Sequence, residues 1–462
     1  MVAIYMWTGN PFVDAGISAI LELSNKKEPQ DIALEDVEKI ARETLIPVFL
    51  TDTWKNNLHP IFPNHKATNT SIKDKKKALE EKIGEFIQQV APIESKGNCI
   101  ACGCRPSVQS MTKSYIPLTG SGSLRNYFSY AVEGADYCST CAFAVQCLPL
   151  VLYSSGGKFL LIHSNSYKIM KYCAKECIKE LNIQIASGNY TGCFNEKYTN
   201  PVNALFYRAG RLLQEHQEKW SDENVSMRVY HFTNYNQGPE LDFYDLPANV
   251  FHFLANINMK DEYRKSWNKI VYRGYFFQKK GEKIPISIKE GEEEKYKNHQ
   301  NQVYLDLLAG NSIVRFFFDV RQRSVHAKWE MLCFYLKEVL QMKEDRIQAI
   351  KQVADKIAQV IQASSNGRKR LGQLERATNY ASFRAVLLRI IHDNLAQKQE
   401  TPVFTFDQYM KHLFPEGAMN WKEVQDLLLF SLYETLHTWL LEESNVQEED
   451  DSEDSVSDDS NN

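Results

Sequence analysis

The pattern of apolar and polar positions predicts a mixed α/β region followed by an all-helical one. Residues 166–187 carry apolar side chains at helical spacing, and Gly188 follows them, which is typical of a helix end. Other segments with helical spacing are 12–23, 34–50, 73–90 and 204–219. Apolar runs that we expect to form strands are 1–6, 159–163, 227–232 and 240–244, with 250–257 and 271–277 as strand or buried candidates.

From residue 326 the pattern is helical throughout. Apolar residues between Ile347 and Ile361 recur at helical spacing, Gly367 follows them, and residues 371–397, 404–413 and 421–441 continue the pattern. We therefore expect an α+β chain, with a mixed α/β N-terminal domain over 1–325 and a C-terminal helical bundle over 326–441.

The formal net charge of −4 is unevenly distributed along the chain. Residues 442–462 hold ten carboxylates and no Lys or Arg, so this acidic tail is expected to be disordered. The remainder has 54 basic against 48 acidic side chains, which is compatible with nucleic-acid binding but also common in other proteins. We find no secretory signal pattern and no apolar stretch long enough to span a membrane, so we expect a cytoplasmic protein with reduced or metal-bound cysteines.

Two Cys-x-x-Cys motifs dominate the candidate chemistry. Cys99 and Cys102 form the first motif, and Cys138 and Cys141 form the second after a 35-residue insert. Each motif offers two thiolates from one tight turn, and four thiolates select zinc or iron over a hard ion. The spacing therefore predicts a structural zinc site in a module inserted at 97–150. The alternative is a set of buried, reduced core cysteines.

The insert between the two motifs has the composition of a DNA-contacting loop. Gly and Ser residues precede Arg125, Asn126 and Tyr127, and Lys113 lies earlier in the insert. Arginine can bind guanine edges or phosphate, asparagine can bind adenine, and aromatic rings can stack on bases. The alternative is a Gly/Ser-rich loop that covers Tyr127 and its aromatic neighbour.

Further candidate nucleic-acid contacts lie outside the insert. Asn10 could present its amide to a ligand at a helix start, although a turn or cap residue is the more common use of asparagine there. Cations that could contact a nucleic-acid backbone are Lys75, Lys76, Lys77, Arg368, Lys369, Arg370, Arg376 and Arg384. An ordinary solvated face is the alternative for these cations.

Several of these segments together resemble a known family. Residues 7–16, the double cysteine motif with its insert at 126–128, and residues 228–232 through 237–239 are similar to the CRISPR-associated CXXC-CXXC proteins. These are large subunits of type I-B Cascade surveillance complexes, and the resemblance covers most of 1–441. The acidic tail departs from the family pattern.

The resemblance implies a non-enzymatic subunit that works with a CRISPR guide RNA and target double-stranded DNA. Such a subunit recognises the target-flanking motif (PAM), helps to open the duplex and stabilises the R-loop, while guide pairing reads the sequence. Its partners would be the backbone, 5′-handle-binding and small subunits of the complex, and a helicase–nuclease or transposition proteins. The helical bundle would correspond to the small subunit. No membrane partner is implied.

Two other functions remain open from the residues themselves. One is a stand-alone zinc-ribbon regulator that binds nucleic acid without a guide. The other is a metal-dependent nuclease that uses His392 and Asp393, or His59 and His65. The sequence contains neither a phosphate-binding glycine loop of the G-x-x-x-x-G-K-[ST] type nor a G-x-S-x-G nucleophile motif, so we expect no enzyme.

Overall fold

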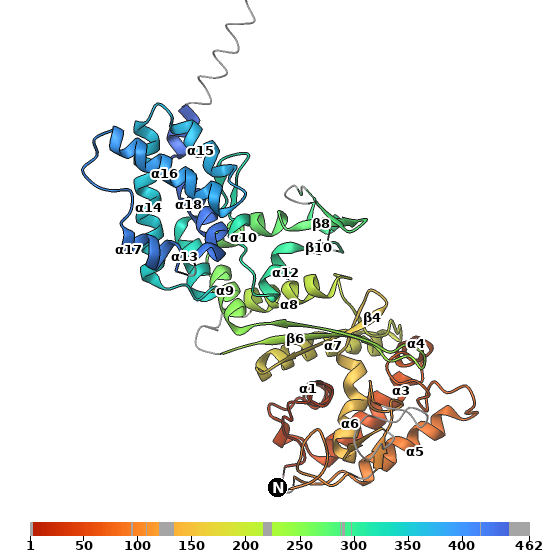
Figure 1. Cartoon of the computed structure of the whole chain (residues 1–462). Coiled ribbons are helices and arrows are strands. Elements are labelled where there is room, and N and C mark those ends of the chain that lie inside the picture. Colours follow the sequence, from red (N-terminus) through yellow and green to blue (C-terminus); the bar gives the residue numbers. More distant parts are fainter. Residues whose placement is uncertain are drawn as a thin grey trace, which may run out of the picture. The chain divides into compact units, whose positions relative to one another are not determined.

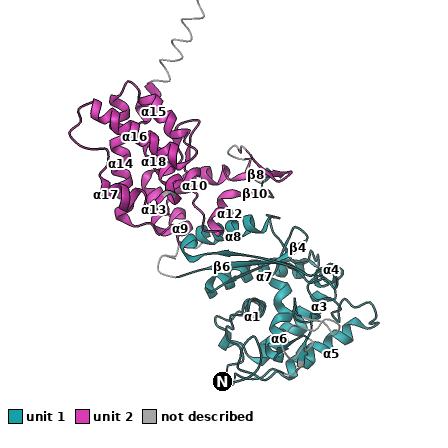
Figure 2. Cartoon of the chain, viewed as in Figure 1, with its two compact units in different colours: residues 1–251, 295–298 teal, residues 252–294, 299–462 magenta. Residues whose placement is uncertain are grey.

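A computed structural model describes residues 3–93, 96–107, 109–119, 134–215, 224–286, 288, 292–296, 298–415 and 417–442. The chain forms two compact units (Figure 2), of which unit 1 comprises 1–251 with 295–298 and unit 2 comprises 252–294 with 299–462. The domain boundary expected at residue 325 falls inside unit 2, and the division into domains 1–325 and 326–441 stays a prediction. None of the described helices combines the length and apolar character that crossing a bilayer would require.

Unit 1 is built on a five-stranded sheet with the order β5-β3-β4-β6-β7. Its neighbouring strands are antiparallel except for the parallel β3/β5 pair. The register pairs Phe159 with Phe232 and Val229 with Tyr244. The strands are β3 (Tyr153–Ser155), β4 (Lys158–Ser164), β5 (Phe194–Asn195), β6 (Met227–Thr233) and β7 (Glu240–Leu246), which confirms the strands expected at 159–163, 227–232 and 240–244.

Long helices cover both faces of this sheet (Figure 1). Helices α1 (Pro11–Ser24) and α7 (Tyr167–Ser187) pack on β4, and α8 (Pro201–Glu215) packs on β6 and β7. The predicted ends of α7 are confirmed, because Ser166 is its N-cap and Gly188 closes it with a φ of 65°. The Phe12 ring of α1 lies 5.6 Å from the Phe232 ring of β6.

A second group of helices in unit 1 surrounds α6 (Ser139–Cys147), every residue of which is buried. Helix α6 packs against α1, against α5 (Lys75–Gln88) and against the 3-10 helix η3 (Leu148–Val151), and α4 (Asp52–Leu58) lies in the same unit. The helix expected over 34–50 is interrupted by a π turn, giving α2 (Leu34–Ile40), η2 (Ala41–Leu45) and α3 (Ile46–Phe49). Pro47 has no N–H to donate, and the Ile46 N–H bonds the Ala41 carbonyl one residue beyond the α-helical partner.

Unit 2 combines small sheets with a helical bundle. Its strands form a sheet of order β10-β8-β9 and a pair β11-β12, with bounds β8 (Tyr275–Lys279), β9 (Glu282–Pro285), β10 (Gln300–Asn301), β11 (Phe318–Asp319) and β12 (Ser324–Val325). The helices in this part of the chain are α9 (Ala248–Asn258, which begins in unit 1), α10 (Asp261–Tyr272), α11 (Glu293–Tyr296, which ends in unit 1), α12 (Gln302–Leu308) and the 3-10 helix η5 (Val314–Phe316).

The C-terminal part of unit 2 is helical, as expected. Helix α14 (Glu344–Ala363) packs on α15 (Gly367–Glu375), α16 (Tyr380–Ala396) and α18 (Trp421–Thr435), and it buries Ile347, Ile350, Val353, Ile357 and Ile361. The remaining elements are α13 (Trp329–Glu338), α17 (Phe406–Gln408), the π turn η6 (Tyr409–Leu413) and the 3-10 helix η7 (Gly417–Asn420). The acidic tail expected to be disordered lies, from residue 443, outside the described residues.

One strand expectation is wrong, and one open alternative is decided. The strand expected over 1–6 is absent from its described residues 3–6, where the Ala3 carbonyl accepts from the Ile93 N–H and the Ile4 carbonyl accepts from the Arg105 guanidinium. For residues 250–257, expected as a strand or a buried segment, the buried alternative is confirmed: they lie in helix α9, where Val250, Phe251, Leu254 and Ile257 are buried. A short apolar run does not by itself distinguish a strand from a buried helix.

Candidate metal centre

The first cysteine motif is a tight turn that requires glycine. The Gly103 N–H donates to the Cys99 carbonyl at 2.8 Å, and the Cys99 N–H donates to the Arg105 carbonyl at 3.0 Å. Gly103 has a φ of 66°, a conformation that glycine adopts without strain. A Cβ on Gly97 would lie 2.2 Å from the Arg105 backbone, so the two sides of the turn approach too closely for a side chain there.

The second cysteine motif lies at the start of the buried helix α6. Cys138 is the N-cap residue, and its sulfur accepts from the Cys141 N–H at 3.4 Å. The positive end of the helix dipole favours negative charge at this position. A thiolate at Cys138 is therefore stabilised by the helix that also carries Cys141.

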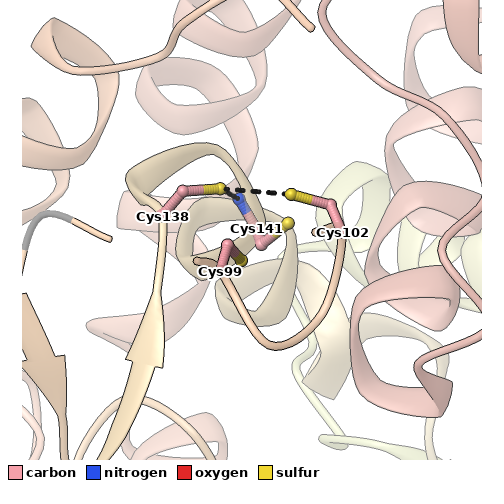
Figure 3. A group of neighbouring side chains, drawn as sticks. All are labelled: Cys99, Cys102, Cys138 and Cys141. Carbon is pink, nitrogen blue, oxygen red and sulfur yellow. Dashed lines mark hydrogen bonds between the residues drawn. The ribbon is translucent and has the colours of Figure 1, made fainter. Parts of the chain in front are cut away.

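The four sulfurs converge into one cluster (Figure 3). The sulfurs of Cys99, Cys102, Cys138 and Cys141 all lie within 4.8 Å of one another, and those of Cys102 and Cys138 are 3.9 Å apart. Tetrahedral zinc with ordinary zinc–sulfur bonds places its sulfurs about 3.8 Å apart. The donor set and spacing therefore fit a structural metal ion, which confirms the predicted clustering.

The hydrogen bonds among the four thiols are unequal. The pKa of Cys102 is lowered by its hydrogen bonding to the neighbouring thiols, Cys138 first. The pKa values of Cys138 and Cys141 are raised, first by their hydrogen bonds to Cys102. A bound cation would replace these shared protons, because metal ligation requires thiolates.

Arg105 contacts the cluster, although the sequence analysis did not identify it as a site residue. Its side chain is buried, and its Nη1 lies 3.7 Å from the Cys102 sulfur. Burial opposes the charge of this guanidinium, but the surrounding cysteines, Cys138 first, raise its pKa. The sequence feature that could have indicated Arg105 is its position three residues after the ligand candidate Cys102.

Other cysteines lie outside the cluster. The Cys104 sulfur lies 3.9 Å from the Met6 sulfur, and Cys147 is wholly buried at the end of α6, where burial raises its pKa. Cys173 and Cys177 on α7 are buried thiols whose pKa values burial also raises. Among the described residues, no second group of three or more His, Cys, Asp or Glu side chains comes together as these four cysteines do.

The two ends of the insert are brought together beside the cluster. Strands β1 (Gln109–Met111) and β2 (Ala135–Tyr137) pair antiparallel, with Met111 opposite Ala135. The Lys113 ammonium donates to the Asn236 carbonyl at 3.2 Å. Arg125, Asn126 and Tyr127, the other predicted loop contacts, lie outside the described residues.

Asn10 caps helix α1 and contacts the cysteine module. Its side-chain oxygen accepts from the Phe12 and Val13 N–H groups at 3.1 and 3.2 Å. Its side-chain nitrogen donates to the Tyr137 hydroxyl at 3.2 Å. The cap interpretation of Asn10 therefore holds, and its amide is engaged by the protein itself.

The candidate backbone-binding cations lie on helix surfaces of the two units. In unit 1, Lys76 and Lys77 are exposed and Lys75 is half-buried at the start of α5, where the Asp74 side chain caps the helix. In unit 2, the exposed cations on or beside α15 and α16 are Arg368, Lys369, Arg376 and Arg384. Arg370 differs, because its Nε and Nη2 bind the Asp393 carboxylate at 2.6 and 3.0 Å.

The histidines proposed for a nuclease are dispersed. His392 is exposed, and its neighbour Asp393 is occupied by Arg370. His65 is wholly buried against Gln146, while the exposed His59 lies 6.1 Å from the Tyr235 ring. No described metal-binding group includes any of these residues.

Comparison with known proteins identifies the segment that contains this cluster. Residues 93–153 match the model of a family described as CRISPR-associated protein (Cas_CXXC_CXXC). The match spans both cysteine motifs and the insert, and it supports a CRISPR-associated protein of this family. No curated protein sequence matches the chain.

Proposed function

We propose that the chain is the non-catalytic large subunit of a type I-B CRISPR RNA-guided surveillance complex. The observation that carries this proposal is the four-cysteine cluster within the segment that matches the CRISPR-associated family. The cluster and the β1/β2 pair hold both ends of the insert together. Zinc is the proposed ion, because four cysteines form a closed structural site with no open position for chemistry.

In the proposed role, the insert meets the flanking motif of double-stranded target DNA. Arg125 and Asn126 would contact base edges and Tyr127 would stack or wedge, while Lys113 would support the base of the loop. The exposed cations of α5, α15 and α16 would follow nucleic-acid backbone and stabilise the displaced strand. Guide RNA and the other complex subunits would supply sequence recognition.

The role of the insert is tested with the assembled guide-RNA complex at fixed salt. Complexes carrying Arg125→Ala or Asn126→Ala are compared with wild type on targets with and without the flanking motif. Loss of discrimination between the two targets supports the proposal, because direct base contacts carry sequence information. Lys76→Ala serves as the control, since a backbone contact weakens both targets alike. Full discrimination by both loop variants excludes the insert from motif recognition.

The same four-cysteine cluster also suits a stand-alone zinc-ribbon regulator. The two functions differ in what purifies with the chain. Co-purifying guide RNA and partner subunits support the surveillance complex. Tight sequence-specific DNA binding by the chain alone, with no RNA, supports the regulator. Nuclease activity of the isolated chain that His392→Ala abolishes would contradict both.

A further inference from the structure

Arg105 joins three separate parts of unit 1 through one buried guanidinium. Only 2% of the residue is exposed. Its Nε donates to the Ala91 carbonyl at 2.8 Å and the Pro92 carbonyl at 3.2 Å, and its Nη2 donates to the Ile4 carbonyl. Its Nη1 faces the Cys102 sulfur at 3.7 Å. The hydrogen-bond partners of Arg105 among the described residues are therefore neutral carbonyls and one sulfur.

A buried guanidinium requires a negative partner. Removing such a charge from water costs several kcal/mol unless an opposite charge lies close by. Carbonyl dipoles satisfy its N–H groups but carry no net charge. Among the residues that the structure describes, the sulfur cluster is the group beside Arg105 that can supply negative charge, and it does so only as thiolates.

The charge of a metal-loaded cluster complements this arginine. A divalent ion bound by four thiolates leaves two negative charges on the site, whereas four protonated thiols leave none. We propose that Arg105 is a positioning residue that compensates the charge of a divalent tetrathiolate site and ties residues 4 and 91–92 to it. This inference rests on the proposed metal and not on the CRISPR role.

Zinc affinity of the full-length chain tests this inference. We expect Arg105→Met to weaken zinc binding about tenfold or more in competition with a chelator, the size expected for losing a hydrogen bond to a charged group. Arg105→Lys should recover part of this loss, because it restores the charge. Lys96→Met is the matched control: it removes an exposed cation three residues before Cys99, where water screens the charge, and should leave affinity unchanged.

A double-mutant cycle separates charge compensation from packing. Cys102→His keeps a metal ligand but removes the thiolate that faces Arg105 and one negative charge of the site. Arg105→Met should therefore cost much less zinc affinity in the Cys102→His chain than in the wild-type chain. An equal cost in both backgrounds would overturn the inference, as would wild-type affinity in Arg105→Met. If Arg105→Met fails to fold, Arg105→Gln, which removes the charge but keeps polar N–H donors, provides the same cycle. A wild-type chain that binds no zinc refutes the metal itself and leaves the guide-RNA experiments to judge the CRISPR role.

Discussion

A Cβ placed on Gly16 would lie 1.8 Å from the carbonyl oxygen of Ala144. Helix α1 therefore approaches the backbone of α6 as closely as a glycine permits. Cys138 is the N-cap of helix α6 and Cys141 lies in its first turn, so this contact fixes the position of two of the four clustered cysteines. The packing of α1 and the geometry of the metal centre are linked through this one approach.

Gly16→Ala is expected to destabilise unit 1 by about 3 kcal/mol, because the added methyl meets backbone that cannot rotate away. Gly84→Ala in α5 is the matched control, since a Cβ there has no neighbour within 4 Å. The control should be neutral or slightly stabilising, because alanine favours a helix over glycine. Urea unfolding measures both variants. Equal stabilities would contradict the close contact between α1 and α6.

Burial of His65 predicts a pH-dependent stability. Burial lowers its pKa from 6.5 to about 4, and the Ala67 N–H donates to Nδ1, which leaves Nε2 to donate to Gln146. The unfolded chain therefore binds the extra proton first as the pH falls. The stability from neutral His65 is complete above pH 6.5 and declines between pH 6.5 and about 4, by about 3 kcal/mol in total.

His65→Asn should flatten this part of the pH profile of the unfolding free energy. The exposed His437 provides the control, because His437→Asn should leave the profile unchanged. Acid release of a metal affects all three proteins alike, so the difference between the profiles reports His65. Parallel profiles for wild type and His65→Asn would contradict a neutral buried histidine.

The salt dependence of DNA binding should separate exposed cations from Arg370, which is paired with Asp393. Lys369→Gln and Arg384→Gln are each expected to reduce the slope of log affinity against log salt by about one in the assembled complex, if each cation contacts a phosphate. Arg370→Gln should leave the slope unchanged, because Asp393 already neutralises Arg370. Unchanged slopes for both Lys369→Gln and Arg384→Gln would remove this face from the interface.

The sequence was most informative where local chemistry decides the structure. Helix α7 begins directly after Ser166, where the helix was predicted to start, and ends at the predicted Gly188. The spacing of Cys99, Cys102, Cys138 and Cys141 was sufficient to predict that they meet. In the first case the residues that determine the structure are neighbours in the sequence. In the second case they follow the spacing of a known metal-binding motif.

The expectations that were wrong or undecided concern contacts between residues far apart in the sequence. Residues 3–6 lack strand pairing because Arg105, about a hundred positions later, donates to the Ile4 carbonyl. The sequence left two interpretations of Asn10, a ligand contact or a helix cap, and did not show that its amide donates to the Tyr137 hydroxyl. No local pattern shows that a charged Arg105 lies buried behind four cysteines. Such long-range partners are set by packing, which the periodicity of one segment does not reveal.

Metal content of the purified full-length chain tests the central claim most directly. We expect one zinc per chain by elemental analysis, lost in Cys138→Ser. Cys193→Ser is the control: its sulfur is buried but bonds the Pro149 carbonyl, so this variant should keep the metal. A native chain without bound metal, together with normal folding and assembly of Cys102→Ser and Cys138→Ser, would contradict the account.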